Sequence, residues 1–186
     1  MIQRLFRAAL LSITLAFTAR VAGAQSVPAV SGSLSFGSGS TSSHAGELWF
    51  SKASAELWSV DLAVRLGGAG STRPVLLLGY DLGVNAQYVN LICRPAPNGS
   101  CFSDFPAPLG PSIGVGVRQV VGRWVVLGVG AGVAHYDGTA RFAEADLSVR
   151  LFSHFALVSE FRYIDLTITG QRAFFTPLTF GARINW

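Results

Sequence analysis

Residues 58–67 read Trp-Ser-Val-Asp-Leu-Ala-Val-Arg-Leu-Gly, and this stretch decides the fold class. Large apolar residues occupy every second position, while small or charged residues occupy the positions between them. Side chains point alternately to opposite faces of a β-strand, so a period of two predicts a strand with one apolar and one polar face. The sequence therefore favours an all-β fold.

The same alternation recurs along the chain. It is clear over residues 76–84, 113–117, 125–133, 143–151, 155–163 and 178–186, and weaker over residues 30–37. With residues 58–66, these segments make eight candidate strands. No helix of consequence is expected, although residues 47–56 could be structured within a loop.

The lengths of the links suggest how these strands are connected. Short links near residues 67–72, 121–123 and 153–154 alternate with longer ones around residues 38–55, 88–108 and 166–173. The link at residues 136–139 is the one exception, because it is short although its place in this alternation calls for a long loop. An even meander of this kind can close on itself, so we predict an antiparallel up-and-down eight-stranded β-barrel.

The N-terminus has the layout of a secretory signal peptide. Two arginines precede an uncharged apolar run over residues 8–19, and small residues follow at positions 22–24. The run is too short to cross a bilayer as a helix. We therefore expect cleavage before Gln25, which leaves residues 25–186 as one domain. An ordinary N-terminal helix of a cytoplasmic protein is the alternative.

Charge and composition exclude some partners. The chain carries a formal charge of +4, but three of its 14 basic residues lie in the predicted leader, which leaves 11 against 10 acidic residues. A nucleic-acid partner is therefore not expected. Half of the residues are apolar and Lys52 is the only lysine, whereas soluble domains cover their surface with lysine and glutamate. The outside of the domain is predicted not to face water.

The polar face of the strands indicates which side points outward. It combines small residues with a balanced set of five acids and five arginines. These are Asp61, Asp81, Glu144, Asp146, Glu160, Arg65, Arg118, Arg150, Arg162 and Arg183. Such a set fits an ion-pair network that fills a narrow lumen, because buried charges need partners. The alternative is a soluble barrel or sandwich whose charged face is solvated.

The apolar face is accordingly predicted to contact lipid, which makes the fold a transmembrane barrel. The residues expected to face outward include Trp58, Leu62, Leu78, Val115, Leu127, Leu147, Phe161 and Phe180. Aromatic residues near strand ends predict two interfacial girdles. They are Trp124, Phe152, Phe155 and Trp186 toward the short turns, and Trp58, Tyr163, Phe174 and Phe175 toward the long loops.

The last eight residues read Thr-Phe-Gly-Ala-Arg-Ile-Asn-Trp. They resemble the C-terminal signal of bacterial outer-membrane barrels, whose elements would here be Thr179, Gly181, Ile184 and Trp186. The mature chain is similar in architecture to small barrels such as the transmembrane domain of outer membrane protein A. The resemblance implies the outer membrane as location, with membrane lipid and the barrel assembly machinery as partners.

Cys93 and Cys101 are the only cysteines, and both lie in the second long loop. An exported chain reaches an oxidising compartment, and Asn98-Gly99 between them favours a turn. We predict a disulfide, worth about 2–3 kcal/mol in the chain-entropy model. A metal site is the weaker alternative, because no histidine is near in sequence.

Barrels of this class serve as anchors, adhesins, resistance factors, channels or lipid-modifying enzymes, so the fold does not give the function. Histidine occurs only at His44, His135 and His154, and an enzyme would need one beside a serine and an acid. His44 follows Ser42 and Ser43, a combination that a serine-rich loop holds by chance.

We expect a non-enzymatic protein that anchors, stiffens or binds an unknown ligand through its loops, as a monomer without cofactor or metal. A lipid-modifying enzyme and a narrow channel are the alternatives.

Overall fold

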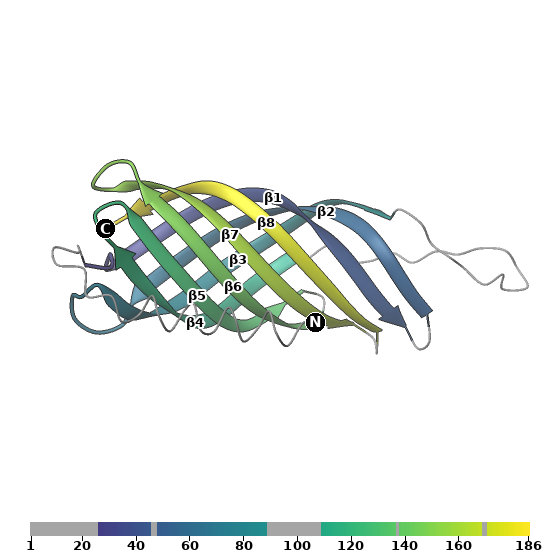
Figure 1. The fold of residues 1–186 in the computed structure, drawn as a ribbon. Helices are drawn as coiled ribbons and strands as arrows, with labels where there is room; N and C mark the ends of the chain where they lie inside the picture. Colours follow the sequence, from purple (N-terminus) through teal and green to yellow (C-terminus); the bar gives the residue numbers. More distant parts are fainter. Residues whose placement is uncertain (1–25, 46–47, 89–108, 137, 169–170) are drawn as a thin grey trace, which may run out of the picture.

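The computed structural model describes residues 26–45, 48–88, 109–136, 138–168 and 171–186. They form eight strands that close into one barrel (Figure 1). The strands are β1 (Val30–Ala45), β2 (Leu48–Arg65), β3 (Thr72–Tyr88), β4 (Leu109–Val121), β5 (Val125–His135), β6 (Thr139–Arg150), β7 (Phe155–Ile168) and β8 (Gln171–Asn185). The described residues include no helix that is long and apolar enough to cross a membrane.

Each strand pairs antiparallel with the next, and β8 pairs with β1 to close the sheet. At the closing seam, Phe36 lies opposite Phe180. Closure satisfies the backbone hydrogen bonds of the first and last strands, which would otherwise form free edges. The predicted closed eight-stranded antiparallel barrel is therefore confirmed.

Two of the predicted long loops are strands instead. Residues 38–45 continue β1 and residues 48–55 belong to β2, and residues 171–173 already belong to β8. The prediction was wrong because residues 38–43 are serine, glycine and threonine, which show no apolar alternation. These residues form a strand without such alternation, because pairing with β2 and β8 supplies their backbone hydrogen bonds. The predicted loop at residues 88–108 lies almost wholly outside the described residues.

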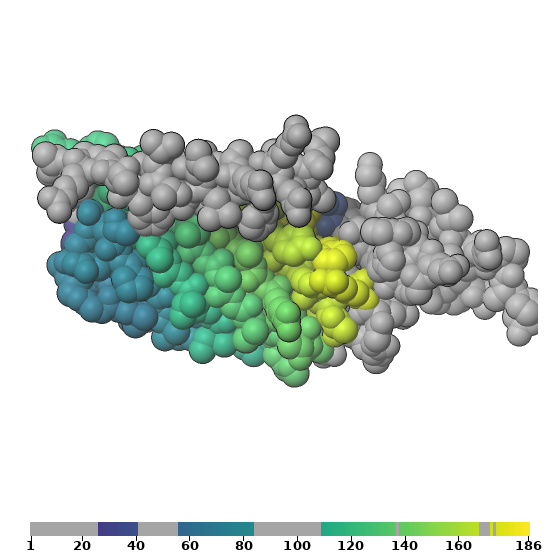
Figure 2. Space-filling view, turned by 60° about the horizontal axis from the view of Figure 1, so that its bottom comes forward, coloured from purple at the N-terminus to yellow at the C-terminus, as the bar shows by residue number. Residues whose placement is uncertain are grey.

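The barrel carries its large apolar side chains on the outside. All eight residues predicted to face outward are exposed, from 37% for Leu62 to 63% for Val115. The residues between them are buried or half-buried, so the molecule has the opposite polarity to a soluble domain. Figure 2 shows part of this wall, on which the coloured strands follow one another in chain order.

The aromatic residues lie near both ends of the wall. Trp124, Phe152 and Trp186 are exposed near the short turns, and Trp58 and Tyr163 are exposed toward the other end. Phe175 is the exception, because it is buried and faces the lumen. It is the neighbour of Phe174 in β8, and adjacent residues of a strand face opposite sides.

Candidate functional site

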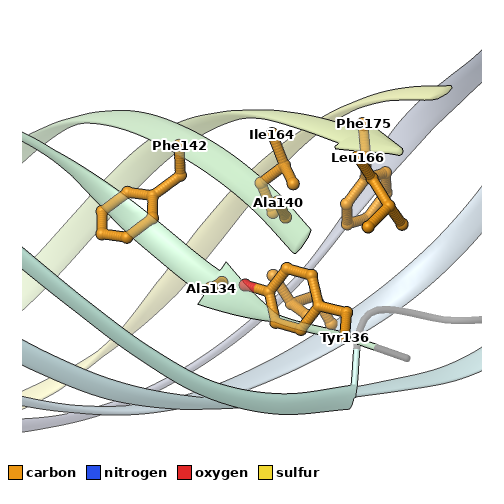
Figure 3. Packing of buried hydrophobic residues seen from close by; sticks show 8 residues of the cluster. Ala134, Tyr136, Ala140, Phe142, Ile164, Leu166 and Phe175 are labelled. Atoms are coloured by element: carbon orange, nitrogen blue, oxygen red, sulfur yellow. The ribbon is translucent and has the colours of Figure 1, made fainter. Parts of the chain in front are cut away.

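The lumen is filled by successive layers of side chains. The turn-side apolar cluster lies nearest the short turns and contains Val27, Ala63, Val75, Leu77, Val120 and Val126. The loop-side apolar cluster, drawn in Figure 3, contains Leu57, Ala134, Tyr136, Ala140, Phe142, Ile164, Leu166 and Phe175. The charged layer lies between them along the strands and contains Asp61, Asp81, Arg118, Glu144, Asp146, Glu160, Arg162 and Arg183.

The N-terminal segment, residues 26–29, closes the turn-side end. Val27 is 1% exposed, and its amide donates to the carbonyl oxygen of Gly70 at 2.8 Å. Arg65 donates to the carbonyl oxygen of Val27 at 2.5 Å, and Arg150 donates to that of Ser26 at 3.2 Å. The structure therefore places these two arginines against this segment, nearer the short turns than the charged layer.

Arg162 is the centre of the charged layer. Its Nη1 donates to both carboxylate oxygens of Asp81 at 2.8 Å. Its Nη2 lies 2.6 Å from Glu160 Oε1, 3.1 Å from Asp61 Oδ1 and 3.3 Å from Glu144 Oε2. One guanidinium thus holds carboxylates from four strands.

Asp81 is further fixed by two hydroxyl groups. Ser59 donates to its Oδ1 at 2.5 Å, and the Tyr136 hydroxyl donates to its Oδ2. Asp81 is fully buried, so these donors and Arg162 replace the water that its carboxylate would otherwise bind. Tyr136 therefore joins the charged layer to the loop-side apolar cluster.

Asp146 is the second centre. Arg183 Nη1 lies 2.5 Å from its Oδ1, and Arg118 Nε lies 3.6 Å from its Oδ2. Arg118 also donates to Ser31 Oγ at 2.6 Å, and Arg183 donates to Ser148 Oγ at 3.2 Å. Each of these small serines accepts one further guanidinium hydrogen bond and leaves room for the arginine.

Glycines make the charged layer sterically possible. A Cβ atom at Gly79 would lie 2.7 Å from Asp61 Oδ1, and one at Gly128 would lie 1.9 Å from Asp146 Oδ2. A Cβ atom at either position would force the carboxylate to move from its ion pairs, so the carboxylates occupy the space that these glycines leave.

Little free volume remains among these groups. A cavity beside Asp61, Glu144, Glu160 and Arg162 has a volume of about 10 Å³ in which the centre of a water molecule can lie. That is roughly the minimum for one water molecule. The side chains, rather than a column of water, fill this part of the lumen.

The three histidines lie on different strands and turns. His44 lies in β1, opposite Trp49 and Arg172, and not in a loop as expected. The ring of His154 contacts the backbone oxygen of Asn185 at the short-turn end, whereas His135 ends β5 at the opposite end. Among the described residues, no group of histidine, cysteine and acidic side chains is arranged to hold a metal.

The C-terminal residues form part of the closing seam. Thr179 is buried, and Ile184 and Trp186 are exposed on the outer wall. A Cβ atom at Gly181 would lie 2.0 Å from the Leu34 oxygen, so this close approach to β1 requires glycine. Recognition of these residues by an assembly machinery remains a prediction.

Three predictions concern residues outside the described part of the chain: the leader, its cleavage before Gln25, and the disulfide between Cys93 and Cys101. All three remain predictions.

Sequence reasoning missed Tyr136 and Val27. Tyr136 lies in a predicted link, and its one signal was an aromatic residue directly after an alternating strand. Nothing in the sequence around Val27 indicates that the N-terminal segment enters the barrel.

No family model and no curated protein matches the sequence. Among solved structures, a barrel from the de novo design of transmembrane β-barrels matches with 11% identity and a TM-score of 0.46, covering 84% of this chain and 98% of that one. Ail, the attachment invasion locus protein of Yersinia pestis, in complex with the heparin analogue sucrose octasulfate, matches with 12% identity and a TM-score of 0.41, covering 83% and 98%.

The outer membrane protease OmpT from Escherichia coli matches with 10% identity and a TM-score of 0.45, covering 87% of this chain and 98% of that one. The likeness is one of architecture, and it carries no site or activity to this chain. By its own structure, the chain is a closed eight-stranded barrel with an apolar outer wall and buried charge pairs in its lumen, and it resembles outer-membrane barrels.

Proposed function

We propose that this protein is a non-enzymatic outer-membrane barrel that anchors a loop-side structure in the membrane and conducts no ions. The observation that carries this proposal is the filled lumen, in which two apolar clusters enclose a layer of buried ion pairs. An open channel would instead need a continuous path of water.

The outer wall supports a position within lipid. Exposed apolar side chains cover it from Trp186 and Trp124 at the turn-side end to Tyr163 at the other. In water such a surface would be a large aggregation-prone patch, whereas in a bilayer it is solvated by acyl chains.

Charged residues on the outer wall support the orientation of the barrel. Arg172 and Asp165 form a two-point ion pair at 2.9 and 2.5 Å, and the exposed Arg141 lies opposite Asp165 on β6. The guanidinium of Arg172 also lies 4.9 Å from the ring centroid of Phe174. Charges directly above aromatic residues fit the boundary between lipid and water.

One side of the barrel continues beyond this boundary. β3 runs on to Tyr88, although β4 begins opposite Leu82, and β1 and β2 reach still further along the same direction (Figure 1). Residues 38–43 of β1 are serine, glycine and threonine, as suits a strand in contact with water. This loop-side extension is the part of the described chain best placed to meet an external partner.

Planar-bilayer recording of the mature protein tests the proposal. We expect little or no conductance, because the ion pairs and apolar clusters leave no water column. The Arg118→Ala variant is the control, since it removes one side chain of the plug while Arg183 still holds Asp146. A large and steady conductance from the unmodified barrel would favour the channel alternative.

A further inference from the structure

The charges of the lumen are unevenly divided between its two centres. Asp146 lies between two arginines, whereas Arg162 alone faces four carboxylates. Were all four ionised, this centre would carry a formal charge of −3. Their side chains are only 0–16% exposed, and an uncompensated buried charge is unfavourable enough that the group takes up a proton instead.

The hydrogens that Arg162 directs at carboxylates are too few for the oxygens they face. Nη1 donates to Asp81, and the Nε hydrogen has no partner among the described residues, which leaves the two hydrogens of Nη2 for oxygens of Glu160, Asp61 and Glu144. Glu144 is the most distant of these three, at 3.3 Å. In addition, Asp61 Oδ2 is a buried acceptor without a hydrogen-bond partner among the described residues.

Among the described residues, Arg162 is the cation that forms ion pairs with these four carboxylates, and the other arginines act on them only from farther away. The polar and charged groups around it are Ser59 and Asp61 on β2, Asp81 on β3, Ser112 and Arg118 on β4, Tyr136 after β5, Glu144 and Asp146 on β6, Glu160 on β7 and Arg183 on β8. Arg118 and Arg183 contact Asp146. Arg65 and Arg150 contact the N-terminal segment.

We propose that Asp61, Glu144 and Glu160 form a proton-binding site, which holds at least one shared proton at neutral pH when the barrel is folded. The proton converts one carboxylate into a carboxylic acid, whose O–H donates to a neighbouring carboxylate oxygen. Glu144 is the preferred carrier of this proton, because its oxygen is the most distant of the three from Arg162 Nη2. The adjoining cavity, with room for about one water molecule, offers a bridge between the carboxyl groups.

This site links folding to pH. Carboxyl groups of the unfolded chain are ionised at neutral pH, so folding takes up the shared proton. Stability contributed by this site then falls as the pH rises from about 4, where the unfolded carboxyl groups ionise, to the pH at which the folded site loses its proton, because over this range the folded state binds more protons than the unfolded state. Within that range, each shared proton makes the folding equilibrium constant fall about tenfold per pH unit.

Infrared spectroscopy of the full mature chain, folded in detergent micelles at neutral pH, tests the proposal. A carboxylic acid has a carbonyl stretching band that a carboxylate lacks, and this band shifts when the acid is deuterated. We expect the band in the folded unmodified protein and its loss on unfolding at the same pH.

Two variants assign the band. Glu144→Gln and Glu160→Gln each remove one of the sharing carboxyl groups, so the band should be lost or strongly reduced and stability should depend less on pH. Asp165→Asn is the matched control, because Asp165 is an acid of the outer wall that pairs with Arg172, and it should leave the band unchanged.

Absence of the band from the folded unmodified protein would overturn the proposal. So would a band of full intensity in both glutamine variants. If one variant does not fold, the other variant and the pH series of the unmodified protein still decide the question. Planar-bilayer conductance has no bearing on this outcome, so the proposed function can fail independently.

Discussion

At the scale of single residues, the packing of the lumen depends on pairs of facing positions. In each pair, a glycine on one strand leaves space for a carboxylate on the next strand. Gly128 lies opposite Asp146 on the neighbouring strand, and Gly79 lies opposite Asp61. In each pair the glycine leaves the volume that the carboxylate occupies. The polarity of the lumen is therefore a packing property as well as an electrostatic one.

The Gly128→Ala variant tests this pairing. Its Cβ atom would lie 1.9 Å from Asp146 Oδ2, which must then move away from Arg118 and Arg183. We expect the free energy of unfolding, measured with urea in lipid vesicles, to fall by about 1–3 kcal/mol, as for an overpacked core. The control is Gly68→Ala, where a Cβ atom meets nothing within 4 Å, and its stability should be nearly unchanged.

The hydroxyl group of Tyr136 makes a second prediction at this scale. Tyr136→Phe removes a donor to the buried carboxylate of Asp81 without opening a cavity. Hydrogen bonds to charged groups contribute about 1.5–3 kcal/mol, and we expect a loss of that size in the same unfolding measurement. Tyr80→Phe, at a half-exposed position of the outer wall, is the control. Equal stability of both variants would contradict the role of Tyr136.

At the scale of strands and segments, alternation indicates which face a residue occupies but not what it meets there. Arg65, Arg150 and Arg162 were all predicted to face the lumen. Only Arg162 lies at the centre of the charged layer, because depth along the strand depends on register with neighbours that the sequence does not state. Arg65 and Arg150 instead contact the N-terminal segment, whose sequence shows no alternation that would have predicted this contact.

The dependence on neighbouring strands also explains why some strand ends were predicted as loops. Residues 58–66 alternate because one face forms the apolar outer wall and the other faces the lumen, so their strand was predicted correctly. Residues 38–45 lie beyond the apolar wall, where no difference between the faces requires alternation. Only their pairing with β2 and β8 makes them a strand, and pairing between distant segments cannot be inferred from one local stretch.

The N-terminal segment gives the prediction for this scale. Arg65→Ala removes the charged donor to the Val27 carbonyl oxygen, so residues 26–29 should detach more often from the barrel end. We expect hydrogen exchange of the Val27 amide, which donates to Gly70, to be about tenfold faster or more. Arg123→Ala, in an exposed short turn, should leave this exchange unchanged.

At the scale of the whole molecule, the barrel places apolar side chains outside and charges inside. Both placements are the ones expected of a protein that is solvated by lipid. Lipid solvates leucine and phenylalanine, but it satisfies neither backbone groups nor charges. Closure of the sheet therefore pairs the backbone, and the lumen collects the charges in a network that compensates them. Both features therefore depend on one central claim, that the outer wall lies in lipid.

Cysteine labelling in isolated outer membranes, where both aqueous sides are open, tests that claim most directly. In a background with Cys93 and Cys101 replaced by serine, Val115→Cys places a thiol on the outer wall and Ser153→Cys places one in a short turn. We predict that a water-soluble maleimide labels the Ser153→Cys variant readily and that only a membrane-permeant reagent labels the Val115→Cys variant. Equal labelling of both variants by the water-soluble maleimide would contradict the account.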